Sequence, residues 1–499
     1  MKQVQVYINR WLLAVLMTGV FFTSQAQVID YAHADSITYQ NYLDHNWKAL
    51  IANGKLALKN NIDYYYLRMR MGEAYYAQEK YALAISQLKK ALAFNHQEKL
   101  ASALLYEAYL QMGTKGQAYR LGMSFNKNLQ QSLGVKARPV ELIDVYGGYT
   151  FSNNGQKNGQ TDILGPQDDF GQQTLIGNQV YLHAGLMLHV VPSYSLYLSG
   201  SYLKIEKTSR FQYNVNKHVK GIPVFGQDGW ILNRYYLQRR TYNESFSGYI
   251  SQFEFYVNNR IFMNNGWALH FYGNLLSIRA PIVDNYHVLI GKTDTLAWQP
   301  STGAVQTTTW IEDGMVFNQT DTSFVNWVAG IDLEKDFSMV NIHLFGTISQ
   351  LGNSNQGQLG LSLFYYPLGS TSFYGKTEFI GFFESGDTYN SQNRVIFNQL
   401  LGVKVFKNTW LEGEYLTGDL HNANMKQGLV VYNLPEKINF IVGMNLHVFV
   451  KNHLEISLIY NYADKENRYK TSQANDQNET YNTLNYQTQS IIGGLKWTF

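Results

Sequence analysis

Ionisable side chains recur at every second position in several segments of the second half of the chain. Asp332 and Glu334 form one such pair, and Glu412 and Glu414 form another. In a β-strand these positions share one face, so each pair would line the same surface. The acids in this pattern are Asp144, Glu254, Asp332, Glu334, Glu378, Glu412, Glu414 and Glu455; Lys376, Lys404, Lys496 and the histidines 183, 189, 270, 343 and 447 accompany them. Such a surface could be a polar lining without chemistry, a passage that selects solutes by charge, or an acid–base site.

Sequence motifs for catalysis are missing from this pattern. The chain has no Gly-x-Ser-x-Gly, no His-Glu-x-x-His and no phosphate-binding glycine loop. It also has no cysteine, which excludes disulfides, thiolate metal sites and cysteine nucleophiles. Serines and histidines on one face could assemble a hydrolase site, but no spacing singles out one pair. We therefore expect no enzyme activity, no catalytic residues, no metal and no cofactor.

The elements that carry these side chains alternate apolar and polar residues. In INFIVGMNLHVFV (438–450) the even positions are apolar, and Asn439, Gly443, Asn445 and His447 oppose them. VYLHAGLMLHV (180–190) and HLEISLIYNY (453–462) show the same period of two, which indicates strands. About fourteen such segments of roughly ten residues follow Pro139, the length that crosses a bilayer as a tilted strand.

The connections between these segments alternate between short turns and long polar loops. The long ones fall near 152–177, 207–242, 279–323, 386–393, 418–436 and 464–483. This alternation is typical of outer-membrane barrels, and an even strand number returns both ends to the short-turn rim. We therefore predict an α + membrane β-barrel class, with an antiparallel barrel of about 14 strands over 139–499. A soluble β-sandwich is the alternative.

The final segment, SIIGGLKWTF (490–499), fits the closing strand of such a barrel. Ile491, Leu495, Trp497 and Phe499 share one face, which we expect to meet the lipid bilayer. The terminal aromatic residue after alternating apolar positions resembles the signal read by the barrel-assembly machinery. We assign Trp497 and Phe499 to that assembly signal.

Residues 1–26 have the pattern of a secretory signal peptide. Lys2 and Arg10 precede the apolar stretch Trp11–Phe22, and Ser24-Gln25-Ala26 is a small-x-small cleavage site. The formal net charge of the chain is only +3, and nothing in it indicates nucleic-acid binding. These features predict export across the inner membrane of a Gram-negative bacterium and residence in the outer membrane.

Residues 27–135 are helical by their apolar spacing and form the predicted N-terminal domain. Within YYLRMRMGEAYYAQEKYALAISQLKKALAFNHQ, Met71, Gly72, Tyr75, Ala84, Leu88 and Ala91 occupy the positions that define the tetratricopeptide repeat. The segment resembles this 34-residue helix pair, with a second unit from Lys99 and a degenerate one around Trp47. His96, Tyr106 and Gly122 depart from the pattern. The resemblance implies a concave face that binds a periplasmic protein or peptide, made of Tyr66, Met69, Glu73, Tyr76, Glu107 and Gln111. The alternative is that these residues pack on the barrel or on the next helix.

The order of the two domains is similar to that of exopolysaccharide-export porins, which join periplasmic repeats to an outer-membrane barrel. The first functional hypothesis is therefore an outer-membrane pore or secretion component whose periplasmic repeats recruit a partner. A non-conducting barrel that anchors the repeats is the second, and a lipid-modifying enzyme is the third.

Overall fold

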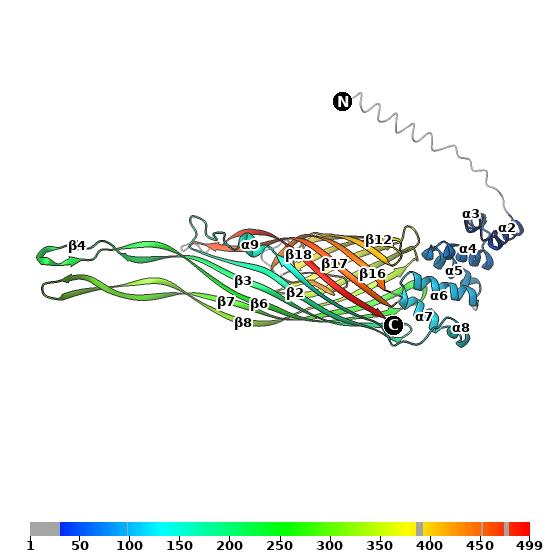
Figure 1. Cartoon of the computed structure of the whole chain (residues 1–499), viewed down its shortest axis with the longest axis horizontal. Coiled ribbons are helices and arrows are strands. Elements are labelled where there is room, and N and C mark those ends of the chain that lie inside the picture. Colours follow the sequence, from blue (N-terminus) through cyan, green and yellow to red (C-terminus); the bar gives the residue numbers. More distant parts are fainter. Residues whose placement is uncertain (1–29, 97, 386–392, 451–452, 474–478) are drawn as a thin grey trace, which may run out of the picture. The chain divides into compact units, whose positions relative to one another are not determined.

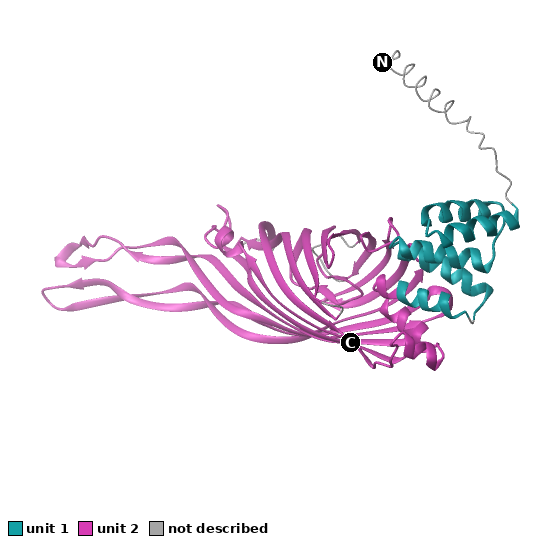
Figure 2. Cartoon of the chain, turned by 45° about the vertical axis from the view of Figure 1, so that its right-hand side comes forward, with its two compact units in different colours: residues 1–108 teal, residues 109–499 magenta. Residues whose placement is uncertain are grey.

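The computed structural model describes residues 30–499 except 97, 386–392, 451–452 and 474–478. The predicted signal peptide therefore lies outside the described residues. The chain divides into two compact units, Met1–Ala108 and Tyr109–Phe499 (Figure 2). Within the described ranges, none of the helices combines the length and the apolar character needed to cross a membrane.

Paired helices make up the first unit. They are α2 Tyr31–Leu43, α3 Trp47–Lys59, α4 Tyr65–Ala77 and α5 Tyr81–Phe94, and α6 Lys99–Gln111 continues into the second unit. Helix α7 spans Lys115–Met123 and α8 spans Lys127–Ser132. Helices α2, α4 and α6 begin at residues 31, 65 and 99, and α3, α5 and α7 begin at 47, 81 and 115. Both series therefore recur every 34 residues.

Glycines allow neighbouring helices to approach closely in this unit. A Cβ atom added to Gly72 of α4 would lie 2.7 Å from Leu88 Cδ2 of α5, and one added to Gly54 would lie 2.6 Å from Met71 Sδ. Leu88 and Met71 are both fully buried, so neither has free space into which it can move.

Replacing Gly72 by valine is therefore expected to destabilise the helical unit by about 1–3 kcal/mol, because the added methyl groups overlap Leu88. Thermal unfolding of the fragment 30–108, followed by circular dichroism, measures this. Ala52→Val, at an exposed position of α3, controls for the helix propensity of valine. Equal melting temperatures for the two variants would contradict the packing argument.

The second unit contains a closed antiparallel barrel of fourteen strands, counted over the described residues. In barrel order they are β1 Val140–Ser152, β2 Phe170–Val191, β3 Tyr194–Lys220, β6 Tyr235–Phe262, β7 Trp267–Gln299, β8 Ala304–Asp336, β9 Val340–Leu351, β10 Ser354–Tyr365, β11 Phe373–Ser385, β12 Asn393–Phe406, β13 Thr409–Thr417, β16 Glu436–Val450, β17 Leu454–Ser472 and β18 Glu479–Thr498. Shorter elements are β4 Val224–Phe225, β5 Ile231–Leu232, β14 Ala423–Met425, β15 Val430–Tyr432, α9 Asn154–Asn158 and the 3₁₀ turns Gln227–Gly229 and Asn264–Gly266.

Pairing between β1 and β18 closes the barrel, as predicted. The register runs from Leu142 opposite Thr498 to Ser152 opposite Thr488. The start of β1 and the end of β18 therefore lie at one rim, which we call the short-turn rim; the other end is the long-loop rim. Closure leaves no unpaired edge along the seam, the condition for a sheet to lie in hydrocarbon.

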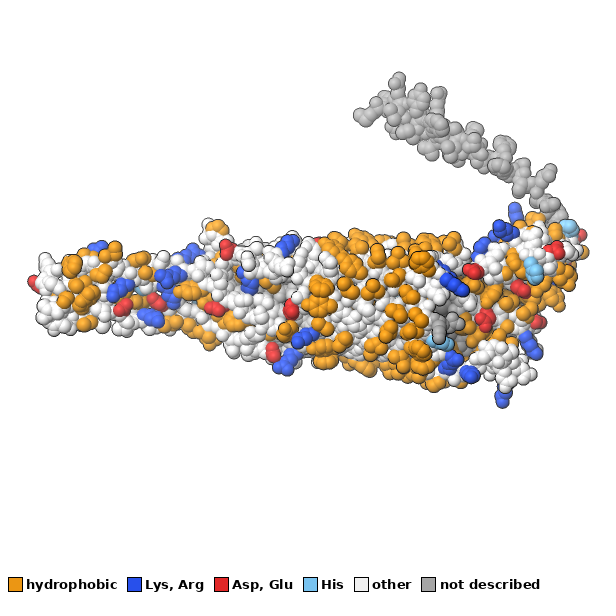
Figure 3. Space-filling view, in the orientation of Figure 1, with side chains coloured by type: hydrophobic (Ala, Val, Ile, Leu, Met, Phe, Trp, Pro, Cys, Tyr) orange, Lys and Arg blue, Asp and Glu red, His pale blue; other side chains and the backbone are white. Residues whose placement is uncertain are grey.

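Apolar side chains form a band around the outside of the barrel. Leu182, Phe253, Leu275, Leu458 and Leu495 are each more than half exposed. Figure 3 shows this band over the barrel strands on the visible face, with charged side chains more frequent on the part that projects beyond it. A band of this kind, around a polar interior, is the surface that a membrane-spanning barrel presents to lipid.

Three of the predicted long loops are largely paired strands instead. In 464–483, β17 and β18 stay paired as far as Ser472 opposite Glu479. Residues 207–242 and 279–323 largely continue β3, β6, β7 and β8 as two long hairpins beyond the barrel, here called the stalk (Figure 1). The hairpins separate because β6 and β7 pair only up to Ser251 and Arg279, just before Pro281, which has no N–H to donate. They approach again through Phe211 and Phe317, whose ring centroids are 4.8 Å apart, and join where β5 pairs with β7.

A β-bulge in β16 corrects the predicted face of one residue. The alternation placed Ile438 on one apolar face with Val442 and Met444. Those two side chains are exposed on the outer face, but Ile438 is buried in the barrel interior. The register shifts between Ile438 and Phe440. One extra residue in a strand reverses which side chains point inward beyond it.

Candidate functional site

A hairpin inside the barrel dominates the site. Residues 418–435, here called the lumen hairpin, connect β13 to β16 and pair β14 with β15. Its tip turns through Lys426, Gln427 and Gly428, all with positive φ. The sequence predicted this segment as a loop outside the barrel, and the structure corrects this, because its contacts come from strands on opposite walls.

The tip of the lumen hairpin is held by side chains of β6, β7 and β8. The Tyr256 hydroxyl donates to the Gln427 carbonyl at 3.0 Å, and Asn258 Nδ2 donates to Gln427 Oε1 at 2.8 Å. Asn274 Nδ2 donates to the Gly428 carbonyl at 3.0 Å. The Gln427 amide also donates to Asp332. The polar groups of the tip are therefore hydrogen-bonded to the barrel wall, as buried polar groups in proteins generally are.

The legs of the lumen hairpin are bonded to other strands. Asn424 and Gln358 of β10 exchange two bonds of 2.8 Å through the Asn424 backbone N–H and carbonyl. Asn422 Nδ2 donates to Glu384 Oε1 at 2.7 Å. On the opposite wall, Asn433 Nδ2 donates to Gln252 Oε1 at 2.8 Å.

Apolar contacts fix the hairpin between the two walls. Leu420, Ala423 and Met425 are buried in one cluster with Ile380, Phe382, Ile396, Leu416, Ile438 and Ala463. Val431 and Leu434 pack against a second cluster, made of Ile176, Ile205, Ile250, Leu276, Ile278 and Ala280. Burying one leucine such as Leu420 contributes roughly 1.5–3 kcal/mol. At this level the barrel is therefore filled by a hydrophobic core.

A polar layer lies between the hairpin and the short-turn rim. Glu334 accepts two bonds from Arg260 Nη2 at 2.6 and 2.8 Å, one from Asn341 at 2.8 Å, and contacts His270 Nε2 at 3.0 Å. Its side chain is buried, so these partners replace the water that an open channel would supply.

The eight acids and Lys404 that the sequence predicted to line the lumen lie on strand faces opposite the exposed apolar residues. Asp144, Asp332, Glu334 and Glu378 are buried. The remaining five have these nearest partners: Glu254 with Gln252 at 2.6 Å, Glu412 with Tyr374 at 2.5 Å, Glu414 with Asn398 at 3.0 Å, Glu455 with His447 at 3.0 Å, and Lys404 with the Trp410 ring at 5.0 Å. Glu412 and Glu455 share His447, at 3.4 and 3.0 Å, and the other residues form local networks elsewhere in the wall.

One of these networks has the composition of a hydrolase triad. Ser201 Oγ lies 2.9 Å from His183 Nδ1, and His183 Nε2 lies 3.1 Å from Asp144 Oδ1. However, Ser201 is buried, and Tyr197 also donates to Asp144. A similar set, Ser457 with His447 and Glu412, occurs elsewhere in the wall. A buried arrangement that recurs fits the satisfaction of lumen charges better than catalysis.

Helix α7 contacts the short-turn rim of the same unit. Arg120 donates to the Met263 carbonyl at 2.6 Å, and Tyr119 stacks on His189 with 4.3 Å between ring centroids. A Cβ added to Gly116 would lie 2.7 Å from Phe262 Cζ. Burial lowers the pKa of Lys115, and the nearby Lys496 adds to this effect. The sequence predicted this helix only as part of the repeats.

The predicted concave-face residues lie on α4 and α6. Tyr66 is exposed on α4, whereas Met69 and Tyr76 are partly buried. Glu73 accepts a bond from the Tyr42 hydroxyl at 3.0 Å. Burial raises the pKa of the Tyr76 hydroxyl, and the charge of the nearby Glu107 raises it further. Glu107 itself is partly buried. Gln111 is exposed at the end of α6, in the second unit.

Over the described residues, no group of three His, Asp or Glu side chains could hold a metal ion. No family model matches the sequence. No curated protein matches it either.

Solved structures with a similar fold are outer-membrane barrels. A bacterial polysaccharide outer membrane secretin covers 72% of this chain and 99% of its own, at 6% identity and a TM-score of 0.30. A FadL homologue of Pseudomonas aeruginosa covers 72% and 90%, at 11% and 0.30. The translocator domain of the autotransporter NalP from Neisseria meningitidis covers 79% and 100%, at 8% and 0.27. The matches also include an outer membrane protease of Escherichia coli. The likeness is one of fold.

Proposed function

We propose that this protein is a gated outer-membrane transport or secretion barrel, closed at rest by the lumen hairpin. The observation that carries the proposal is the hairpin itself, which occupies the lumen and contacts opposite walls. A barrel of fourteen strands without such an insertion would leave a water-filled channel. The hairpin replaces that channel by a barrier that must move before a solute can pass.

Placement in the outer membrane is part of the proposal. The apolar band of the barrel and the closed seam support it, together with the signal-peptide pattern of residues 1–26. In this placement the short-turn rim faces the periplasm. Trp497 and Phe499 stay proposed as the signal for the barrel-assembly machinery.

The helical unit would then lie in the periplasm and recruit a partner protein or peptide. The 34-residue spacing of the helix starts supports the tetratricopeptide resemblance. The proposed contact residues are those of the predicted concave face: Tyr66, Met69, Glu73, Tyr76, Glu107 and Gln111. Tyrosine and methionine side chains supply the contact area, and Glu73 and Glu107 favour a partner with basic residues.

A disulfide across the lumen tests the gate. The natural chain has no cysteine, and a Cβ at Gly428 would lie 3.2 Å from Val328 Cγ1, which is compatible with a disulfide between Gly428→Cys and Val328→Cys. In planar bilayers the reduced double variant is expected to show brief openings like those of the natural protein. Oxidation should abolish them, because the hairpin can no longer leave the wall.

A control variant and one possible negative result are needed to interpret that experiment. Gly428→Cys alone controls for strain, since residue 428 has φ of +79°, and its openings should not depend on oxidation. If the natural protein and both variants stay silent under all conditions, the hairpin is a permanent filling and the barrel is an anchor for the repeats.

A further inference from the structure

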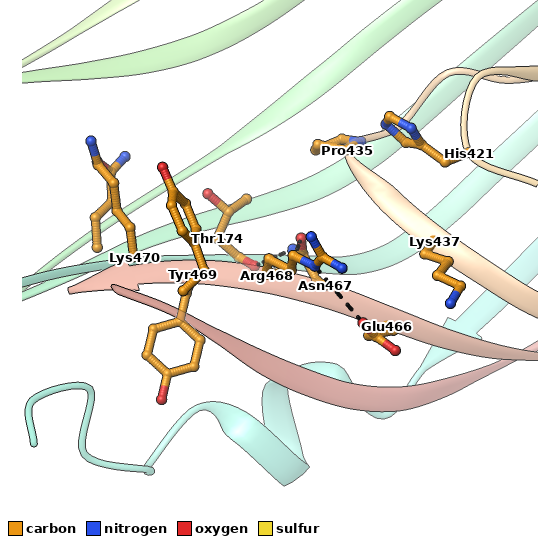
Figure 4. A pocket seen from close by; sticks show the side chains of 11 residues that line it. Thr174, His421, Pro435, Lys437, Glu466, Asn467, Arg468, Tyr469 and Lys470 are labelled. Carbon is orange, nitrogen blue, oxygen red and sulfur yellow. Dashed lines mark hydrogen bonds and ion pairs between the residues drawn. The ribbon is translucent and has the colours of Figure 1, made fainter. Parts of the chain in front are cut away.

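A cavity of about 350 Å³ opens at the long-loop rim, between the legs of the lumen hairpin and the ends of β2, β16 and β17 (Figure 4). His421 and Pro435 of the hairpin legs lie on one side of it, and Thr174 of β2 lies on another. Its volume is at the lower end of the range of small-molecule sites, enough for about one or two sugar rings.

A change of strand neighbours builds this cavity. Strand β17 pairs with β16 up to Asn467, opposite Glu436, and then pairs with β2, where Lys470 lies opposite Gln172. Lower in the barrel, the even-numbered side chains of β17, such as Leu458, are exposed on the outer face. At the rim, Glu466, Arg468 and Lys470 of the same series line the cavity with Gln172. The exchange therefore brings charged residues from the outer face of the strand to a shared concave surface.

The lining is positively charged. Lys437, Arg468 and Lys470 oppose a single lining acid, Glu466. Glu466 lies 4.0 Å from Arg468 Nε, and Lys470 Nζ is 2.8 Å from Glu479 Oε1. Within the described ranges, no carboxylate forms an ion pair with Lys437, although Glu466 is its partner in the strand register. The positive charge of Lys437 is therefore available to bind an anion from solution.

Aromatic and amide groups complete the cavity. Tyr469 and Tyr481 line it, and Tyr481 is 39% exposed, so part of its ring is open to a ligand. Gln172 adds an amide to the same wall. Aromatic faces pack against the apolar C–H faces of sugar rings, and amides bond to sugar hydroxyls, whereas lysine and arginine bind carboxylates.

We propose that this cavity binds an acidic sugar, a saccharide unit that carries a carboxylate. The proposal deepens the proposed function, on which it rests, because it names the class of solute that meets the closed barrel at the long-loop rim. A ligand here contacts both legs of the lumen hairpin, since His421 follows β13 and Pro435 precedes β16. An inorganic anion would bind the lysine and arginine side chains of the lining and would not need the two tyrosines.

Titration calorimetry on the full chain in detergent tests this assignment, with D-glucuronate and D-glucose as probes. Glucuronate is expected to bind saturably and more weakly as salt is added, and glucose at least about tenfold more weakly, because it lacks the charge. Lys437→Gln combined with Arg468→Gln should weaken glucuronate by about tenfold or more. The matched control Lys404→Gln removes a cation at the other end of the barrel, beside Trp410, and should change nothing.

Sulfate separates a sugar site from a general anion site. Tyr481→Ala should weaken glucuronate and leave sulfate unaffected. The assignment is overturned if glucuronate shows no saturable binding, if glucose binds equally well, or if sulfate binds as tightly as glucuronate and Tyr481→Ala has no effect. Because binding is measured on the closed protein, these failures would leave the gating test untouched, and a failed gate would leave this binding test untouched.

Discussion

Removal of the lumen hairpin is expected to convert a nearly silent barrel into a steadily open channel. In this variant a short Gly-Ser linker replaces residues 421–433, so that β13 and β16 remain connected. The deletion takes away the tip at Gln427 and Gly428 and the apolar contacts of Met425 and Val431 with the two walls. Single-channel recording in planar bilayers should show a large, persistent rise in conductance, since a barrel of this strand number encloses a wide lumen.

The same recording distinguishes the hairpin from other barriers. Heat-modifiable migration on a gel must first show that the deleted protein still forms a barrel, because loss of the hairpin exposes apolar wall residues such as Phe382 and Leu276. A matched deletion of residues 222–233, at the tip of the stalk, should leave the conductance at the level of the natural protein. If the hairpin deletion also stays silent, a different element closes the lumen, and the contacts of α7 with the short-turn rim become the first candidate.

Proline at the seam is expected to abolish the folded barrel. Val145 of β1 pairs with Leu495 of β18 and with Ala184 of β2, and its side chain is half exposed on the outer face. Val145→Pro removes a backbone donor from the middle of this ladder. A backbone group left unpaired in hydrocarbon costs roughly 4 kcal/mol or more, and the two edges of the open sheet would add further unpaired groups. We expect nearly complete loss of the heat-modifiable band from the outer membrane.

Two controls accompany the seam variant. Val145→Ile keeps the donor and the apolar surface, so it should assemble normally. Val224→Pro places the same residue in β4 at the end of the stalk, away from the seam, and should be tolerated. Wild-type abundance of folded Val145→Pro would mean that β1 does not need its complete ladder to close the barrel.

The period-two pattern of the sequence was sufficient to predict the barrel. Successive residues of a barrel strand face lipid and lumen in turn. The alternation of apolar and polar residues in a strand such as β18 therefore indicates which side chains face lipid and which face the lumen. For this reason the strand number, the closing role of residues 490–498 and the lumen side of residues such as Glu334 could be predicted without coordinates. The close packing expected at Gly72 followed in the same way from the spacing of a helix pair.

Local alternation failed where a strand changes its environment or its neighbour. Residues 207–242 and 279–323 would expose polar side chains both as loops and as paired strands. The sequence pattern therefore does not distinguish the paired stalk from two loops. The bulge at Ile438 reversed a face because one extra residue shifts the alternation without changing the composition. The partner exchange of β17 likewise depends on where β16 begins, opposite Asn467.

The sequence alone determined that a polar lumen exists and which strands line it, because that information lies in neighbouring residues. Whether the lumen is open or closed was decided by the tertiary structure. The segment 418–435 reads as a polar connection, yet Gln427 and Asn424 find hydrogen-bond partners on walls that are distant in the sequence. Leu420 and Val431 likewise find apolar clusters there, made of strands from opposite sides of the barrel. Those partners come together only when the sheet closes, so the position of the hairpin is a property of the closed barrel.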